Sequence, residues 1–137
     1  MPQSLLQTQN QLPVVLIVDD NSAIRDMVSW ALAMDGFEAA EATEGQEALN
    51  WIYNAAQEGR CPSAILLDLA MPGMDGSTFL VHLRQQWTRL YASTPMPAII
   101  VITAGHRSDV VSLGVERVIL KPFHVRELLD IVHSLTN

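Results

Sequence analysis

Hydrophobic residues in this chain follow two patterns that alternate from one end to the other. One is a short, uninterrupted apolar run, which is typical of a β-strand covered on both faces. The other places apolar residues three or four positions apart in a polar stretch, which is typical of an amphipathic helix. The runs predict strands at Val14–Val18, Ala64–Leu67, Ala98–Ile102 and Arg117–Leu120, with a weaker one at Phe37–Ala42.

Capping residues and periodic apolar positions predict helices between these strands. A first helix begins at an Asn21 or Ser22 cap. Thr43, with Gln46 three residues later, forms a capping box for a second helix. Further helices are expected after a Ser77 cap, as a short one between His106 and Leu113, and as a last one with Val125, Leu128, Leu129, Val132 and Leu135 on one face.

The polar residues that follow the strands predict a binding site. Strands alternating with helices imply right-handed βαβ crossovers and a parallel sheet with helices on both faces. In such sheets the carboxyl ends of the strands open into one crevice, where ligands bind. Four of the runs end there on Asp19 and Asp20, Asp68, Thr103, and Lys121. We therefore expect three carboxylates, a hydroxyl and an ammonium to share a pocket.

The adjacent carboxylates of Asp19 and Asp20 favour a metal site. Removing two like charges from water is costly unless a cation neutralises them. Mg²⁺ suits this need, since it binds one or two carboxylates together with waters and phosphate oxygens. A lone Asp at the end of a strand is more often a helix cap. The pair together with Asp68 favours Mg²⁺ instead.

Length, composition and charge narrow the class of protein. A chain of 137 residues, 49% hydrophobic and 17% charged, suits one globular domain with one core. We expect residues 1–12 to form a flexible N-terminal tail and residues 13–137 the domain. The net charge of −7, without a Lys/Arg cluster, opposes direct binding of nucleic acid.

Other sequence features argue against membrane insertion and export. The apolar runs are too short for a transmembrane helix. The first residues lack the features of a secretory signal. A single cysteine, Cys61, excludes an internal disulfide. We therefore expect a cytoplasmic protein without membrane contact.

Four motifs resemble those of the receiver domain of two-component response regulators, and the likeness runs from about Val14 to the C-terminus. They are LIVDDN at 16–21, LLDLAMPGMDG at 66–76, VITA at 101–104 and LKPF at 120–123. Each motif alone is weak evidence, but together and in this order they are specific. The resemblance implies a flavodoxin-like α/β fold, a doubly wound three-layer sandwich around a five-stranded parallel sheet of order 2-1-3-4-5.

The resemblance also assigns the phosphoacceptor and the metal ligands. It implies that Asp68 accepts a phosphoryl group from a phosphohistidine of a sensor histidine kinase or a histidine phosphotransfer protein. Asp20 and Asp68 would bind Mg²⁺ directly, together with the backbone carbonyl of Ala70. Asp19 would act mainly through a metal-bound water.

Thr103 and Lys121 would complete this pocket. In-line phosphoryl transfer requires mainly that the reacting groups are positioned and that charge is stabilised. A carboxylate nucleophile beside Mg²⁺ and an ammonium group can meet both requirements. By resemblance, Lys121 would pair with a phosphoryl oxygen, aimed by a cis bond to Pro122. Thr103 would hydrogen-bond a phosphoryl oxygen and move inward on phosphorylation.

Two departures from the family pattern fall on the face that usually meets output partners. Val118 stands three positions before the lysine, where members commonly have an aromatic residue that turns inward, and valine is too stiff and small for that motion. The segment from Thr103 to Lys121 is about one helical turn shorter than usual. We expect phosphorylation to be intact and its readout to be altered, through loop order or a different face.

Trp30 and Met34 widen the apolar face of the first predicted helix beyond the stripe that a core needs. Partner docking is one interpretation, because kinases dock at this helix in the family. Core filling is the interpretation that we prefer.

These features predict a single-domain response regulator, because the chain ends just after the last predicted helix. It would receive a phosphoryl group and switch contacts with an unknown downstream protein, and a homodimer is compatible with this role. It would catalyse only its own phosphorylation and dephosphorylation.

Three alternatives remain. A Mg²⁺-dependent aspartyl-phosphate phosphatase of the haloacid dehalogenase type needs a second Asp two residues after the nucleophile, where this chain has Ala70. A flavodoxin-like cofactor binder needs a phosphate-cradling loop after the first strand, where this chain has DDNSAIR. A pseudo-receiver that serves only as a scaffold is disfavoured because all five site residues are present.

Overall fold

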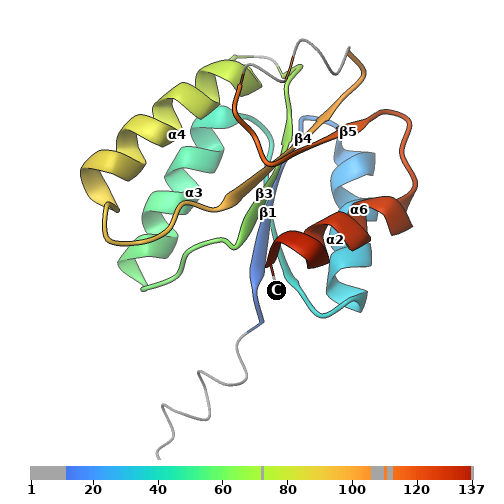
Figure 1. The fold of residues 1–137 in the computed structure, drawn as a ribbon, viewed down its shortest axis with the longest axis horizontal. Helices are drawn as coiled ribbons and strands as arrows, with labels where there is room; N and C mark the ends of the chain where they lie inside the picture. The colour runs from blue at the N-terminus through green and yellow to red at the C-terminus, as the bar shows by residue number, and fades with distance from the viewer. Residues whose placement is uncertain (1–11, 72, 106–109, 111–112, 137) are drawn as a thin grey trace, which may run out of the picture.

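A computed structural model describes residues 12–71, 73–105, 110 and 113–136. Within them, five parallel strands form one sheet in the order β2-β1-β3-β4-β5 (Figure 1). The predicted α/β fold and strand order are confirmed. The strands are β1 (Val14–Val18), β2 (Glu38–Ala42), β3 (Ala64–Asp68), β4 (Ala98–Thr103) and β5 (Arg117–Leu120).

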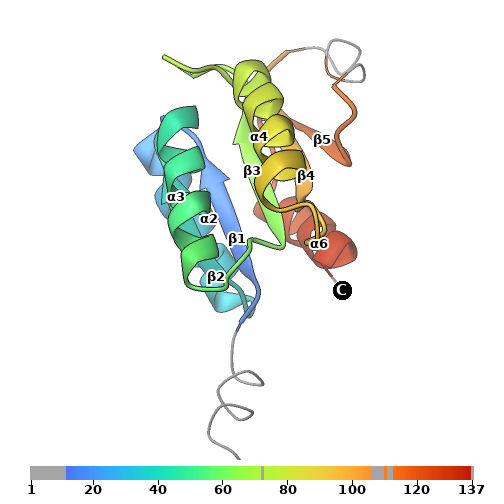
Figure 2. The same ribbon diagram turned by 90° about the vertical axis from the view of Figure 1, so that its left-hand side faces the viewer.

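Helices cover both faces of this sheet (Figures 1 and 2). In the described residues, α2 (Ser22–Met34) and α6 (Val125–Thr136) lie on one face, and α3 (Gly45–Gln57) and α4 (Gly76–Leu90) on the other. Within the same residues, no helix is both long and apolar enough to span a membrane. Two predictions lie largely outside the described residues: the tail at 1–12 and the short helix between His106 and Leu113.

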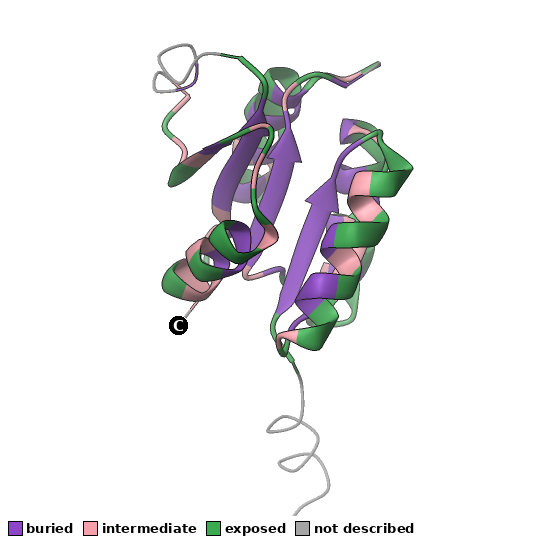
Figure 3. Cartoon of the chain, turned by 90° about the vertical axis from the view of Figure 1, so that its right-hand side faces the viewer, coloured by how far each residue is buried: buried purple, intermediate pink, exposed green. Residues whose placement is uncertain are grey.

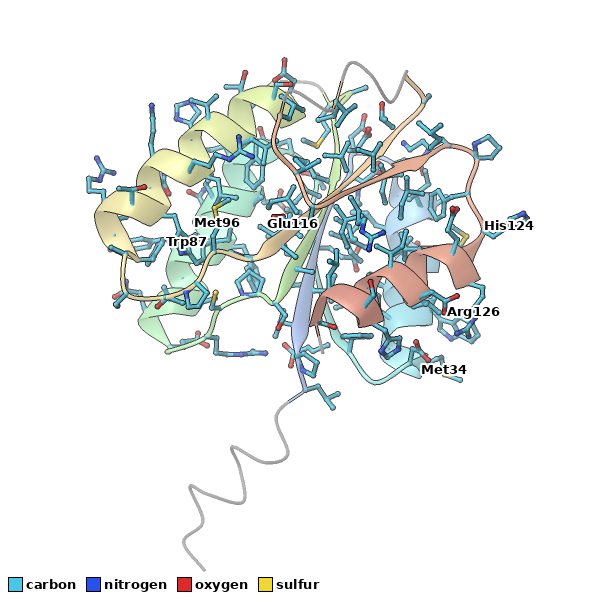
Figure 4. The ribbon with its side chains drawn as sticks, in the orientation of Figure 1. Met34, Trp87, Met96, Glu116, His124 and Arg126 are labelled. Carbon is cyan, nitrogen blue, oxygen red and sulfur yellow. The ribbon has the colours of Figure 1, made fainter. Side chains whose placement is uncertain are left out.

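Two apolar cores lie between the sheet and its helices. Successive strand residues point to opposite faces, so Leu16 joins the core under α3 and α4, whereas Ile17 joins the core under α2 and α6. The three central strands β1, β3 and β4 are therefore buried along most of their length, while the helices expose their outer sides (Figure 3). Trp87 and Met96 pack on the α3–α4 side (Figure 4). This burial fixes the sheet as a rigid platform for the loops at its ends.

The cap of the first helix is confirmed, and the cap of the second is shifted. The Asn21 side chain accepts a hydrogen bond from the Ile24 amide at 3.0 Å. The predicted box of Thr43 and Gln46 is wrong, because the Glu44 carboxylate caps α3 instead.

Glu44 accepts the amide of Glu47 at 2.6 Å, and Glu47 reaches back to the amide and hydroxyl of Thr43. Glu44 therefore caps α3 one residue later than predicted, and Glu47 binds the residue before that cap. At α4 the predicted Ser77 cap is also wrong, since Asp75 accepts the Thr78 amide at 2.8 Å. The cap of α4 therefore lies at Asp75, two residues earlier in the sequence than predicted.

The outer face of α2 carries an exposed apolar surface, which we call the α2 patch: Met27, Trp30 and Met34. Their exposed fractions are 42%, 69% and 71%. Met34 points away from the sheet at the end of α2 (Figure 4). Core filling by Trp30 and Met34 is therefore wrong, because Val28, Ala31 and Leu32 already fill the space between α2 and the sheet.

Candidate functional site

The candidate site lies at the carboxyl ends of β1, β3, β4 and β5. The chain passes from β1 to β2, which pairs with one edge of β1, and later to β3, which pairs with the other edge of β1. The loops after β1 and β3 therefore diverge, which opens a crevice at this point in doubly wound sheets. The predicted polar residues stand at this crevice.

Three carboxylates meet there as predicted. Asp19, Asp20 and Asp68 each place an oxygen within 4.8 Å of the others. Asp19 and Asp68 are buried, with exposed fractions of 3% and 5%, whereas Asp20 is exposed. This donor set consists of hard oxygen atoms open to solvent on one side, which fits Mg²⁺ with water in its remaining positions.

Asp68 ends β3 in surroundings that disfavour its charge. Burial raises the pKa of Asp68 above its usual value, and the charges of Asp19 and Asp20 add to this effect. The Ala70 amide, which donates to Asp68 Oδ1 at 3.1 Å, and the Lys121 ammonium lower that pKa in part. Ionising Asp68 in this pocket therefore costs free energy, and a bound divalent cation would lower that cost.

Asp19 is held by its backbone and its side chain. Its amide donates to the carbonyl of Ala42 at 3.1 Å, which ties it to the end of β2. Its Oδ1 accepts the Asn21 amide at 2.8 Å. Its Oδ2 lies 3.8 Å from Lys121 Nζ. Asp19 therefore links the β1 loop to β2 and β5.

Lys121 joins the pocket from the end of β5. Its Nζ lies 3.6 Å from Asp68 Oδ1, so the ammonium contacts two of the three carboxylates. Its amide donates to the Thr103 carbonyl at 2.8 Å. The expected cis bond between Lys121 and Pro122 is present.

Thr103 ends β4 and is buried, with 8% of its surface exposed. Its hydroxyl accepts a hydrogen bond from the Gly105 amide at 3.0 Å. The pairing of Thr103 with Leu120 in the β4–β5 ladder places it one residue from Lys121 across the sheet. The hydroxyl and the ammonium therefore come from neighbouring strands at one end of the sheet.

Close packing shapes the loop that carries Ala70. Gly76 approaches this loop so closely that a Cβ there would lie 2.7 Å from the Leu69 Cα and 2.9 Å from the Asp68 carbonyl oxygen. A side chain at Gly76 would therefore displace the loop beside Asp68. The glycine that ends the 66–76 motif thus has a steric role that its place in the motif alone did not reveal.

One residue near the site was missed from the sequence. Arg25, in the first turns of α2, donates from Nη1 to the Asp19 carbonyl at 2.8 Å and from Nε to Glu41 at 3.2 Å. An arginine five residues after an acidic pair is a weak signal, because solvent-exposed arginines are common on helices.

Comparisons with known proteins agree with this geometry. A family model described as the response regulator receiver domain matches residues 15–133. The phosphate regulon transcriptional regulatory protein PhoB of Escherichia coli (strain K12) is 33% identical over 119 residues, which cover 84% of this chain and 48% of PhoB. The chain thus spans about half the length of the curated relatives it matches.

Solved structures resemble the chain over nearly its whole length. The response regulator TrrA of Thermotoga maritima, solved in complex with Mg²⁺ and BeF, is 28% identical with a TM-score of 0.73 and covers 90% of this chain and 99% of its own. The chemotaxis response regulator CheY4 of Vibrio cholerae is 30% identical with a TM-score of 0.72, covering 91% and 99%.

Proposed function

The chain belongs to the response regulator receiver domain family, and from that membership we propose that it is the phosphoacceptor of a two-component phosphorelay, phosphorylated on Asp68. The observation that carries the proposal is the cluster of Asp19, Asp20 and Asp68 with the Lys121 ammonium between two of them. Receiver domains act as phospho-switches, and this pocket has the groups that such a switch needs.

The proposed reaction is an in-line displacement. An Asp68 carboxylate oxygen forms a bond to the phosphorus of a phosphohistidine, the P–N bond breaks, and its electron pair returns to the imidazole, which takes up a proton. Mg²⁺, held by Asp20, Asp68 and the Ala70 carbonyl with Asp19 acting through water, would neutralise phosphoryl charge. Lys121 would pair with one phosphoryl oxygen.

Thr103 would supply the signal. Its hydroxyl, now engaged by the Gly105 amide, would turn to a phosphoryl oxygen and move the end of β4. Residues 13–137 would form the switch domain, and an unidentified downstream protein would recognise the changed surface in the cytoplasm. In this account the protein catalyses only its own phosphorylation and dephosphorylation.

The phosphodonor would be a sensor histidine kinase or a histidine phosphotransfer protein. The α2 patch supports this partner class, because α2 begins directly beside Asp20 and leaves Trp30 and Met34 exposed along its outer side. An exposed apolar surface on the helix that begins at the pocket suits a protein donor, which must bring its phosphohistidine to Asp68 and hold it there.

Two alternatives are less well supported. A haloacid dehalogenase-type phosphatase would need an acid at Ala70, whose side chain is a methyl group. A scaffold without phosphorylation would have no use for a Lys121 ammonium within 4 Å of both buried carboxylates.

Acetyl phosphate with Mg²⁺, followed by intact mass measurement, tests the proposal. We expect the wild-type chain to gain one phosphoryl group and Asp68→Asn to gain none. Asp26→Asn, which removes an exposed carboxylate from α2, is the matched control and should be labelled like wild type. An unlabelled wild type would overturn the proposed function.

A further inference from the structure

Arg25 forms a bridge between the acidic loop and strand β2. Its Nη1 donates to the carbonyl oxygen of Asp19 at 2.8 Å, and its Nε donates to Glu41 Oε1 at 3.2 Å. The Arg25 side chain is 14% exposed and the Glu41 side chain 40%. The guanidinium therefore donates two hydrogen bonds to acceptors in different elements. Its planar and rigid set of N–H donors, the guanidinium fork, is suited to such bridging.

The carbonyl that Arg25 engages belongs to the peptide that joins Asp19 to Asp20. The other side of Asp19 is already fixed, since its amide donates to Ala42 at 3.1 Å. Rotation of the Asp19–Asp20 peptide would break the bond to Arg25, so Arg25 favours one direction for the chain as Asp20 leaves β1. Among the described residues, no hydrogen bond is formed by the Asp20 carboxylate itself, so its placement depends on this backbone.

We propose that Arg25 is a positioning residue for the metal site: it holds the Asp19–Asp20 peptide so that the Asp20 carboxylate meets Asp68 at the distance a divalent ion needs. This inference rests on the proposed function, because it concerns the Mg²⁺ that phosphorylation would use. Arg25 acts through the backbone and Glu41 orients it from β2.

Electrostatics and positioning predict opposite effects of removing Arg25. If its charge were its main contribution, loss of a cation beside three carboxylates would make Mg²⁺ bind more tightly. If it positions Asp20, its loss would weaken binding, as changes to residues that orient metal ligands typically do, by about 10-fold or more. The sign of the change in Mg²⁺ affinity thus separates the two roles.

The chain offers a matched control in Arg60. Arg60 also forms an ion pair with a glutamate of β2, in this case Glu38 at 2.7 Å, with side chains 32% and 47% exposed. Glu38 begins β2, at the end of the strand opposite to the site. Arg60→Ala therefore removes a comparable ion pair without touching the acidic loop.

Isothermal titration of the full chain with Mg²⁺ tests the proposal, at fixed pH and salt, with circular dichroism of each variant as a check of folding. We expect Arg25→Ala and Arg25→Lys each to weaken Mg²⁺ binding by about 10-fold, since lysine keeps the charge but lacks the fork. Arg60→Ala should bind like wild type. If Arg25→Ala does not fold, Arg25→Lys decides the question.

Affinity in the folded Arg25 variants equal to or tighter than that of wild type would overturn the proposal, as would an equal loss in Arg60→Ala. A wild-type chain that binds no Mg²⁺ would also overturn it. Failure of the proposed function would look different, because the wild-type chain would then gain no phosphoryl group from acetyl phosphate even though it binds Mg²⁺.

Discussion

Asp68, the proposed phosphoacceptor, is a buried carboxylate whose ionisation opposes folding. It is 5% exposed and lies beside two other carboxylates. Burial, and then the neighbouring charges, raise its pKa above the usual value of 3.8, against the opposing effects of the Ala70 amide and Lys121. The folded protein therefore binds the proton of Asp68 more tightly than the unfolded chain, and the ionised carboxylate costs stability.

Asp68→Asn should accordingly stabilise the metal-free protein at neutral pH, by about 1 kcal/mol. Because the wild-type penalty is fully present above the raised pKa and disappears as the pH falls toward 3.8, the gain should shrink in acid. Urea unfolding with a chelator, at about pH 7 and about pH 4, measures both effects. A destabilised Asp68→Asn at neutral pH would contradict this account, and Asp26→Asn should change little.

At the scale of elements, the two sides of α2 both carry apolar side chains but differ in what covers them. Its buried side, Val28, Ala31 and Leu32, packs on the sheet. Its outer side, Trp30 with Met27 and Met34, is exposed. Because exposed apolar side chains contribute little to the core, substitutions there should affect partner binding more than stability.

Trp30→Gln should slow phosphoryl transfer from an autophosphorylated histidine kinase that labels the wild type, by about 10-fold, as expected for loss of a central aromatic contact. Labelling by acetyl phosphate should be unchanged, since the pocket is intact. Val81→Gln, which changes a side chain 54% exposed on α4, is the control. Equal kinase rates for Trp30→Gln and wild type would exclude the α2 patch as the docking surface.

Hydrogen bonds from two sides hold the segment that leads into strand β5, and this affects where a signal could leave the pocket. Glu116, just before β5, accepts the Ile99 amide at 2.6 Å, and its own amide donates to the Ile99 carbonyl. Arg84 of α4 donates to the carbonyls of Leu113 and Gly114. Val118 is half-buried and packs against the α3–α4 core. The approach to β5 is therefore fixed at both sides, whereas the Thr103 hydroxyl at the end of β4 has one hydrogen-bond partner among the described residues, the Gly105 amide.

Amide hydrogen exchange with and without Mg²⁺ and beryllofluoride should show this difference. We expect the largest change in protection at 103–105, where Thr103 would exchange partners, and little change at 117–120. A response centred on β5 and the segment before it would show that this chain uses the family's ordinary readout, in spite of Val118.

At the scale of the whole molecule, the sequence predicted the structure correctly wherever a pattern allowed only one structural interpretation. Uninterrupted apolar runs identified the buried strands, and the residues after them identified the pocket, because parallel strands bring their carboxyl ends together. Asp19, Asp20, Asp68, Thr103 and Lys121 all stand at that end of the sheet.

The errors arose where several residues competed for one role. Glu44 and Asp75 displaced the predicted caps Thr43 and Ser77, because neighbouring residues offered equivalent oxygen acceptors. The exposure of Trp30 depends on how much of the surface of α2 is covered by the sheet. The spacing of apolar residues along the helix does not specify that width. Arg25 could not be assigned because its partners, the Asp19 carbonyl and Glu41, come together only in the folded chain.

The most direct test of the central claim is chemical localisation of the phosphoryl group. The chain would be treated with acetyl phosphate and Mg²⁺ and then with borohydride, which reduces an acyl phosphate to the alcohol, and the modified peptide would be sequenced by mass spectrometry. We predict homoserine at position 68 and nowhere else. Homoserine at Asp19 or Asp20, or none at all, would contradict the assignment of Asp68 as the phosphoacceptor.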